Sequence, residues 1–401
     1  MWAALLIAAD LSGSFTLSDR TEVRVRAPGT NATGTTAASL DLETAPEARL
    51  SLATRRVRFA FTYAPRLTLW DLNAGAHPTL LHAGAAHVEW HSHLTRLSLD
   101  QAGSYGGVSF AYVSLTPGPE GARPRVDVVP APQIIQYASS TTTLASRQTL
   151  RLWTIDTSFG YRADGGADDP SRKVLPFQHG PFGEVAADYA VSRRDHLVTT
   201  ASASEAAFSS SLGGLSSAPE SVVTELDEGY RHRWSRTTET RLTVGVSEVR
   251  ARDSAIAAYA FDTHPVAELV VEHRPAASGA HVDLRAGVRL GPVVNRLLGI
   301  VDERVQGTLA ATFTYKRVAT HAFAVASQSV PVSSQNATKL LFGELGMTCG
   351  ASTTVSFDAG LRGSWQRIDN LRGQPAGLAQ AAFLQGSVFA GVTLRAPPTR
   401  L

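Results

Sequence analysis

One stretch of the sequence decides how the rest is interpreted: Val57-Arg58-Phe59-Ala60-Phe61-Thr62-Tyr63-Ala64-Pro65-Arg66-Leu67-Thr68-Leu69. Its large apolar side chains fall on alternate positions, and small, polar or charged residues fill the positions between them. A β-strand turns successive side chains to opposite faces, so this pattern predicts a strand with one apolar and one polar face. The stretch is about 13 residues long, whereas most globular strands have about 5–6 and a tilted strand needs about 9–11 to cross a bilayer. It is therefore long enough to span a membrane.

The same alternation recurs along the chain and is clearest in the last third. Val282, Leu284, Ala286, Val288 and Leu290 alternate there with Asp283, Arg285, Gly287 and Arg289. We count about 18 such strands, within a range of roughly 16–20, which is typical of a large barrel. Short connections containing Ser, Thr and Arg alternate with long ones rich in Gly, Pro and Asp, such as Pro117–Pro132 and Ala163–Pro181.

This asymmetry of connections predicts the fold class and the location. Outer-membrane barrels have short periplasmic turns, long extracellular loops and an even number of strands. Closure is required because an open sheet edge would leave backbone groups without partners in lipid. We therefore predict an all-β, transmembrane antiparallel β-barrel, integral to the bacterial outer membrane, with both termini periplasmic. The alternative, a secreted solenoid or sandwich, predicts a fixed repeat length and shorter strands, and we find no such repeat.

Two strands carry expected irregularities. The strand from Leu40 to Leu52 contains Pro46, which predicts a break because proline has no N–H for the ladder. Between Leu150 and Tyr161 the apolar positions change parity, which predicts a bulge after a short turn at Ser146-Arg147.

Composition supports one barrel domain. Charged residues make up 18% and apolar residues 43%, and mean hydropathy is near zero, so the two kinds are finely mixed. The formal net charge of +2 gives no indication of a nucleic-acid partner, and one cysteine excludes an internal disulfide framework. We expect residues 1–9 to be either a remnant of a signal peptide or the start of the first strand. Residues 10–396 would form the barrel, and residues 397–401 a C-terminal tail.

The polar residues that alternate with the apolar ones along each strand are the ones that would line a pore and contact what passes through it. A lipid-facing Lys or Arg costs about 2–4 kcal/mol at the bilayer midplane, so charged residues on the strands should face the lumen. Both signs are present, which indicates either a wall braced by ion pairs or a hydrophilic surface for sugar hydroxyls. The predicted lumen-lining residues are Arg58, Arg66, His87, Glu89, His91, Glu184, Asp188, Asp283, Arg285, Arg289, Glu344, Asp358 and Arg362.

Other candidate sites give weaker signals. His87, Glu89 and His91 share one strand face and resemble a metal-binding stripe, but a closed site needs a further ligand, and we expect a polar lumen stripe. Trp70, Trp90, Trp153, Trp234 and Trp365 fall near predicted strand ends, where barrels carry aromatic girdles; Trp70 has the opposite parity, which points it into the pore. Hydrolase, metalloprotease and nucleotide-binding motifs are absent from the sequence, so we expect no enzymatic activity, no catalytic residues, no metal and no cofactor.

Several short segments resemble a known group of proteins. They are Tyr63 to Asp71, Leu80-Leu81-His82, Leu97 to Gln101, Ser104-Tyr105-Gly106, Val174 to Pro176, His179-Gly180-Pro181 and Ser192 to Asp195. Together they are similar to porin-like outer-membrane β-barrel proteins of myxobacteria and their relatives, some of which belong to exopolysaccharide or capsule export loci. The resemblance implies a conduit and carries no catalytic residues across.

The resulting expectation is an outer-membrane conduit that exports exopolysaccharide or capsule. Its partners would be the lipid bilayer and periplasmic components of polysaccharide export. The alternatives are a general diffusion porin for small solutes and a non-conducting structural barrel.

Overall fold

The strands of this chain close into one barrel. The computed structural model describes residues 12–27, 29–31, 34–36, 38–109, 134–208, 220–253, 258–277, 279–295, 300–330, 337–369, 380–397 and 399–400. Eighteen antiparallel strands form the barrel wall, which confirms the predicted fold class and strand number. They are β1 (Ser12–Arg26), β4 (Ser39–Ala53), β5 (Val57–Tyr63) continued by β6 (Arg66–Trp70), β7 (His77–His91), β8 (Thr95–Ser109), β9 (Ile134–Leu150), β10 (Trp153–Gly166), β11 (Gln178–Ala190), β12 (Asp195–Phe208), β13 (Glu220–Arg233), β14 (Thr238–Asp253), β15 (Ala258–His273), β17 (Ala280–Asn295), β18 (Ile300–Tyr315), β19 (Val318–Ser329), β20 (Ala337–Gly350), β21 (Val355–Asp369) and β22 (Gln380–Arg395).

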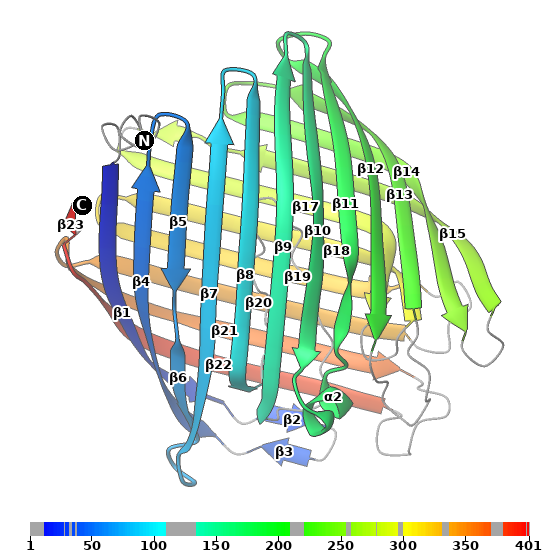
Figure 1. Ribbon diagram of the computed structural model, residues 1–401. Coiled ribbons are helices and arrows are strands. Elements are labelled where there is room, and N and C mark those ends of the chain that lie inside the picture. Colours follow the sequence, from blue (N-terminus) through cyan, green and yellow to red (C-terminus); the bar gives the residue numbers. More distant parts are fainter. Residues whose placement is uncertain are drawn as a thin grey trace, which may run out of the picture.

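The first and last of these strands close the wall. Each strand pairs antiparallel with the next, and β1 pairs with both β4 and β22, so that Val23 stands opposite Leu42 on one side and Ala390 on the other. Short strands β2 (Gly29–Asn31), β3 (Gly34–Thr36), β16 (Ala276–Ala277) and β23 (Thr399–Arg400) extend its edges. In Figure 1 the strands from β1 to β12 run upright in the near wall, and the strands of the far wall cross behind them at a steep angle.

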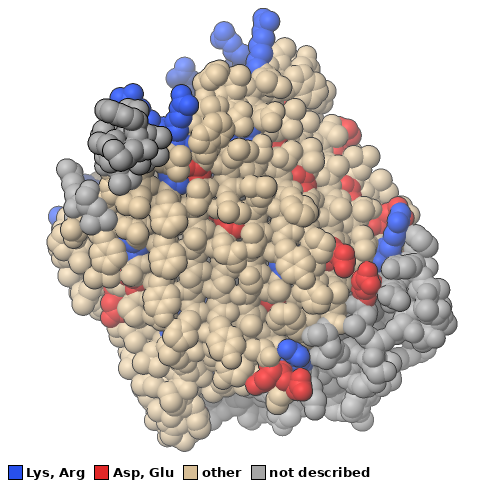
Figure 2. Space-filling model, viewed as in Figure 1, with Lys and Arg blue, Asp and Glu red and all other residues tan. Residues whose placement is uncertain are grey.

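The two faces of the wall differ as the alternation predicts. Apolar side chains of alternate residues are exposed on the outer face; Leu361 is 53% exposed and Val388 is 62% exposed. Trp90, Trp153 and Trp234 are exposed with them near the strand ends, and the Trp153 ring packs against Tyr189. Trp70 has the opposite parity and is buried, with its Nε1–H donated to Thr79. Most of the visible outer surface in Figure 2 carries no charged side chain.

The two ends of the barrel differ in their connections. At one end, here called the short-turn rim, the strands are joined by residues 54–56, 92–94, 151–152, 191–194, 234–237, 274–279, 316–317 and 351–354. The first residue of β1 and the last of β22 lie at the same end (Figure 1). The opposite end, the long-loop rim, carries most of the longer connections. Two of its connections are short, because only residues 254–257 separate β14 from β15 and only residues 296–299 separate β17 from β18.

The predicted bulge near Leu150 is wrong, because the chain turns there. β9 continues through Ser146-Arg147 to Leu150, and β10 begins at Trp153, directly opposite Leu150. Arg151 in the turn has a φ of 25°. Leu150 and Trp153 lie on the same face of two antiparallel strands, so the change of apolar parity marks a tight hairpin.

The predicted break at Pro46 is also displaced. β4 is continuous, and the interruption falls at Ala64-Pro65 between β5 and β6. Ala48 pairs with Tyr63 and Thr44 pairs with Leu67, so Pro46 stands opposite Pro65 in an unchanged register. Neither proline has an N–H to donate, and the ladder between them is lost.

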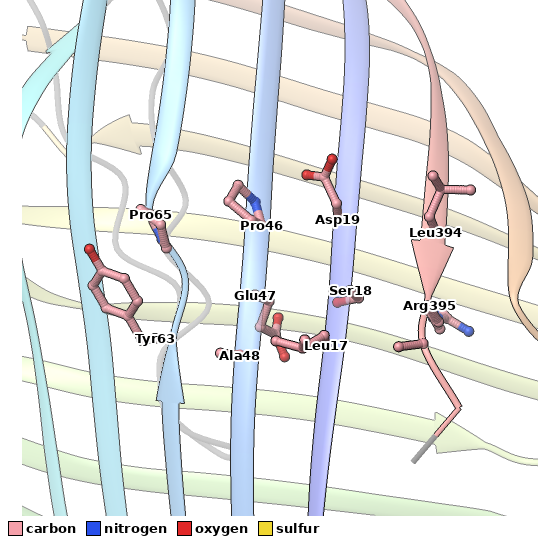
Figure 3. A pocket seen from close by; sticks show the side chains of 11 residues that line it. Leu17, Ser18, Asp19, Pro46, Glu47, Ala48, Tyr63, Pro65, Leu394 and Arg395 are labelled. Atoms are coloured by element: carbon pink, nitrogen blue, oxygen red, sulfur yellow. The ribbon is translucent and has the colours of Figure 1, made fainter. Parts of the chain in front are cut away.

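These prolines line an open pocket of about 570 Å³ at the junction of the first and last strands. Leu17 and Asp19 of β1, Leu394 of β22 and Ala396 are among its other lining residues. Figure 3 shows Pro46 on β4, Asp19 on β1 and Leu394 on β22 side by side, with Pro65 beside them in the link between β5 and β6. Asp19 pairs with Pro46 and Leu394, and it accepts a hydrogen bond of 3.0 Å from the Thr44 hydroxyl.

The connection from β10 to β11 folds against the inside of the wall. It contains a short helix, α2 (Asp169–Val174), capped by Asp168, which accepts a hydrogen bond from the backbone N–H of Ser171. The Ser171 side chain, and after it this backbone N–H, hold the pKa of Asp168 below its usual range. Leu175 follows the helix and is buried against Ile135, with Val108 and Tyr137 beside it. Within the residues that the structure describes, no helix has the length and apolar character to cross a bilayer.

Other expectations lie partly or wholly outside the described residues. Residues 1–9 and the loop Pro117–Pro132 are among those not described. In the predicted tail, Thr399 and Arg400 form β23, where Thr399 stands opposite Phe15 of β1.

Candidate functional site: the inner face of the barrel

The residues predicted to line the lumen occupy one parity of their strands. Each alternates with the exposed apolar side chains of its own strand: Arg58 with Val57, Glu344 with Leu345, and Arg362 with Leu361. The strand registers then bring residues distant in sequence side by side, because Arg58 stands opposite Glu89 and Glu344 opposite Arg362. We call this polar side of the wall the inner face.

A buried carboxylate is the centre of the first cluster on this face. Glu89 is 4% exposed and forms an ion pair with Arg96. Arg58 lies 4.0 Å from it and His87 Nε2 lies 3.6 Å from it. The other ring nitrogen of His87, Nδ1, is 2.6 Å from Asp100 Oδ1. Two members of the predicted stripe, His87 and Glu89, thus lie within ion-pair distance of charged neighbours, whereas His91 Nδ1 is buried without a hydrogen-bond partner among the described residues. In the part of the chain that the structure describes, no group of three or more His, Cys, Asp or Glu side chains is placed to hold a metal ion.

Two arginines of this region face each other across neighbouring strands. Arg96 of β8 stands directly opposite Arg147 of β9. Arg147 donates two hydrogen bonds to Asp156, at 2.6 Å from Nε and 3.0 Å from the terminal nitrogen. Arg96 and Arg147 were not among the predicted lining residues. Arg96 lies one residue from Leu97 and three from Leu99, and this odd spacing would have placed it on the polar face. Arg147 was missed because its segment was interpreted as a turn.

A second network connects the first strands of the barrel to the last. Glu22 accepts hydrogen bonds of 2.6 Å from both Arg20 and Arg24. Arg20 also lies 3.9 Å from Asp358 of β21, across the junction of β1 and β22. Arg24 lies 3.7 Å from Glu43, whose other oxygen is 3.3 Å from Arg66. Arg66 and Asp358 from the predicted set therefore belong to one chain of charges.

The remaining predicted residues lie on the later strands. Asp188 pairs with His196 at 2.7 Å and with Arg231 at 2.5 Å. Glu344 pairs with Arg362 at 2.7 Å and lies 3.3 Å from His321.

Three more ion pairs lie in the later part of the wall; one starts from Arg274 in the connection after β15, and another spans two intervening strands. They are Arg274–Asp283 at 3.3 Å, Arg285–Glu272 at 3.7 Å and Arg289–Glu225 at 2.6 Å. The last joins β17 to β13 over β14 and β15. Glu184 is exposed and has no ion pair among the described residues, and His91 stands opposite Arg96 in register.

Exposure within these pairs is unequal. The Arg58 side chain is 64% exposed against 6% for Glu89, and the Arg66 side chain is 54% exposed against 13% for Glu43. Long arginine stems reach inward, while the shorter carboxylates stay at the wall. The guanidinium groups are therefore the part of these pairs that a molecule inside the barrel would meet.

Comparison with solved structures shows the fold. The chain is similar to the FrpB iron transporter of Neisseria meningitidis in two variants. The F5-1 apoprotein has 9% identity and a TM-score of 0.52 over 98% of this chain and 83% of that one. The F3-3 variant has 9% identity and a TM-score of 0.50 over 94% and 81%. Pseudomonas aeruginosa OccK1 (OpdK) has 11% identity and a TM-score of 0.48 over 96% and 99%. No protein in the curated set matches the chain.

A family model identifies the chain more closely. Residues 5–391 match the model described as the EpsX exopolysaccharide export family, which covers nearly the whole barrel. This confirms the expected relation to exopolysaccharide export and, with the closed barrel and its apolar outer face, places the protein in the outer membrane. The chain belongs to the EpsX exopolysaccharide export family.

Proposed function

We propose that the barrel is the passive conduit through which the exopolysaccharide crosses the outer membrane, and that it has no enzymatic activity. The polymer would pass along the inner face, lined by Arg58, Arg66, His87, Glu89, His91, Glu184, Asp188, Asp283, Arg285, Arg289, Glu344, Asp358 and Arg362. The observation that carries the proposal is the contrast between the two faces. An apolar outer face suits lipid, and a charged and hydroxyl-rich inner face suits a hydrated polymer.

The paired charges suit this role. Most of the inward carboxylates lie within ion-pair distance of an arginine or a histidine, as Glu89 does with Arg96 and Asp188 with Arg231. Such pairing keeps the wall polar without leaving buried charges uncompensated, which would cost several kcal/mol each. Sugar hydroxyls can then exchange hydrogen bonds with the wall in place of water.

The lengths of the connections support one orientation of the barrel in the membrane. We assign the short-turn rim, and with it both chain termini, to the periplasm, because outer-membrane barrels place their short turns there. Periplasmic components of the export machinery would then deliver the polymer at this rim. α2 and Leu175 would lie near the extracellular mouth, against the inner face.

Two measurements test the conduit. Planar-bilayer recording should show stable open-channel current from the purified barrel, because an unplugged 18-stranded barrel leaves an aqueous channel. A sealed barrel would refute both the conduit and the diffusion-porin alternative.

Deletion of the gene should abolish surface polysaccharide while leaving outer-membrane permeability to small solutes unchanged. Normal polysaccharide with reduced solute uptake would favour the porin.

A further inference from the structure

We propose that the exported polymer is anionic and that Arg58, Arg96 and Arg147, just inside the short-turn rim, bind its acidic groups. This inference rests on the proposed conduit and adds the chemical class of its cargo. The three residues belong to three strands, β5, β8 and β9, and they lie close to the turns that join those strands to their neighbours.

The arrangement of the three arginines favours a ligand over a structural role. Like charges directly opposite each other on neighbouring strands are destabilising, yet Arg96 faces Arg147. Their side chains are 55% and 57% exposed, respectively. By comparison, Arg20 and Arg24 on β1 are separated by Glu22, which pairs with both.

Their carboxylate partners leave donors free for a ligand. Asp156 accepts hydrogen bonds from Nε and one terminal nitrogen of Arg147, and the other terminal nitrogen has no hydrogen-bond partner among the described residues. Glu89 lies within ion-pair distance of both Arg58 and Arg96, so two guanidinium groups share one buried carboxylate. A planar guanidinium with unused N–H groups matches a carboxylate or a phosphate, which it can bind through two parallel hydrogen bonds.

The short-turn rim extends the same charge outward. Its eight connections contain no Asp or Glu, although the whole chain has a net charge of only +2. Six of them carry basic residues: Arg55, Arg56, Arg151, Arg193, Arg194, Arg236, Arg274, Lys316 and Arg317. In Figure 2 Lys and Arg side chains project from the upper edge, where Figure 1 places this rim. Some charge is compensated, since Arg274 pairs with Glu272 and Asp283.

A basic rim would also attract anionic lipid headgroups. The arginines inside the barrel favour an anionic polymer over a lipid. Phospholipids reach the rim and the outer face only, whereas Arg96 and Arg147 occupy the inner face. A basic rim that leads into exposed inward arginines suits a polyanion that enters the barrel, because a charged cleft raises the local concentration of its counter-ion. On the later strands Glu184 is exposed and unpaired among the described residues, so the wall from β5 to β9 is the side that would hold the polymer.

Oligosaccharide binding tests the inference on the complete barrel in detergent. The probes are an oligogalacturonate and a neutral maltooligosaccharide of equal length, titrated by calorimetry at low and high salt. We expect the uronate to bind about tenfold more tightly than the neutral oligomer, and R96Q/R147Q to lose that difference, because exposed charge pairs contribute up to about tenfold together. The control R96K/R147K keeps both charges and should retain most of the preference. High salt should weaken only uronate binding.

Three results would overturn the inference of an anionic cargo. The first two are equal binding of the two oligomers and an unchanged uronate preference in R96Q/R147Q. The third is that R55Q/R56Q/R193Q/R194Q abolishes both the uronate preference and binding to phosphatidylglycerol vesicles. The last result would assign the basic rim to lipid. Failure of the conduit is separate, because it appears as the absence of current in planar bilayers. A conducting barrel without uronate preference would refute the anionic cargo alone.

Discussion

At the scale of single residues, the inner face also contains aromatic side chains placed over glycines of the neighbouring strand. Gly360 of β21 stands opposite Phe389 of β22, and Gly160 of β10 stands opposite Phe182 of β11. A Cβ added at Gly360 would lie 2.5 Å from both the Phe389 ring and the Leu345 carbonyl oxygen. The alternation of the sequence places Gly360 and Phe389 on the polar parity. It does not show that they touch, because that requires the β21–β22 register.

Substitution of Gly360 therefore has a clear expected outcome. Gly360→Ala should lower the free energy of unfolding by about 1–3 kcal/mol, because overpacking forces the Phe389 ring and the backbone to move. The urea midpoint of the heat-modifiable folded band on gels measures the loss. Gly363→Ala is the matched control on the same strand, since its added Cβ meets only the Gln385 carbonyl oxygen at 3.8 Å. Equal midpoints for the two variants would contradict the packing described for Phe389.

At the scale of single elements, local patterns predicted strand faces well and strand ends poorly. The stretch Val57–Leu69 has the predicted faces, but it is divided into β5 and β6. Its interruption depends on Pro46 in another strand, which becomes the neighbour of Pro65 only once β4 and β5 are paired. The β9–β10 hairpin was missed for a related reason, because a turn without Gly or Pro at Arg151-Leu152 gives no local signal.

The assignment of faces within one strand is tested by adding the same charge to each side. Leu361→Arg should destabilise the folded barrel in lipid vesicles by about 2–4 kcal/mol, because it puts a cation on the lipid-facing side near the middle of β21. Ser364→Arg puts the cation on the inner face and should change stability by less than about 1 kcal/mol. The yield of heat-modifiable protein after refolding compares them. A reversed order would invert the faces of β21.

The helix α2 tests whether a connection is fixed against the inner wall. Leu175 is 1% exposed, so Leu175→Ala should cost about 2–5 kcal/mol of local stability and release residues 167–177 to added protease. Acid should have a similar effect, because folding lowers the pKa of Asp168 and its contribution is lost as pH falls through that lowered value. The matched control is Asp169→Ala, whose side chain is 91% exposed and should leave cleavage nearly unchanged. Resistance of Leu175→Ala to protease would show that Leu175 does not anchor α2.

At the scale of the whole molecule, strand number and outer-membrane class followed from counting alternating segments and comparing connection lengths. The ion-pair networks did not follow, because they join strands through registers that no local pattern contains. Arg20 of β1 and Asp358 of β21 are neighbours only because the barrel closes. Long-range pairs of this kind make the inner face a property of the closed wall, and they explain why its residues were predicted as a set and their partners were not.

Closure itself can be tested with a disulfide across the junction of β1 and β22. Val23 stands directly opposite Ala390, and Val388 stands opposite Val25. In a Cys349→Ser background, Val23→Cys with Ala390→Cys should oxidise readily, because opposite residues have Cα atoms about 4.5–5.5 Å apart, within the range a disulfide bridges. Val23→Cys with Val388→Cys is displaced by two residues, about 7–8 Å, and should oxidise poorly. The bridge links strands near the two ends of the chain, so it should also raise the free energy of unfolding by about 2–4 kcal/mol. Equal oxidation of both pairs would mean that β1 and β22 are not held in this register, and an open or sliding junction would remove the edge closure that a β-structure needs in lipid.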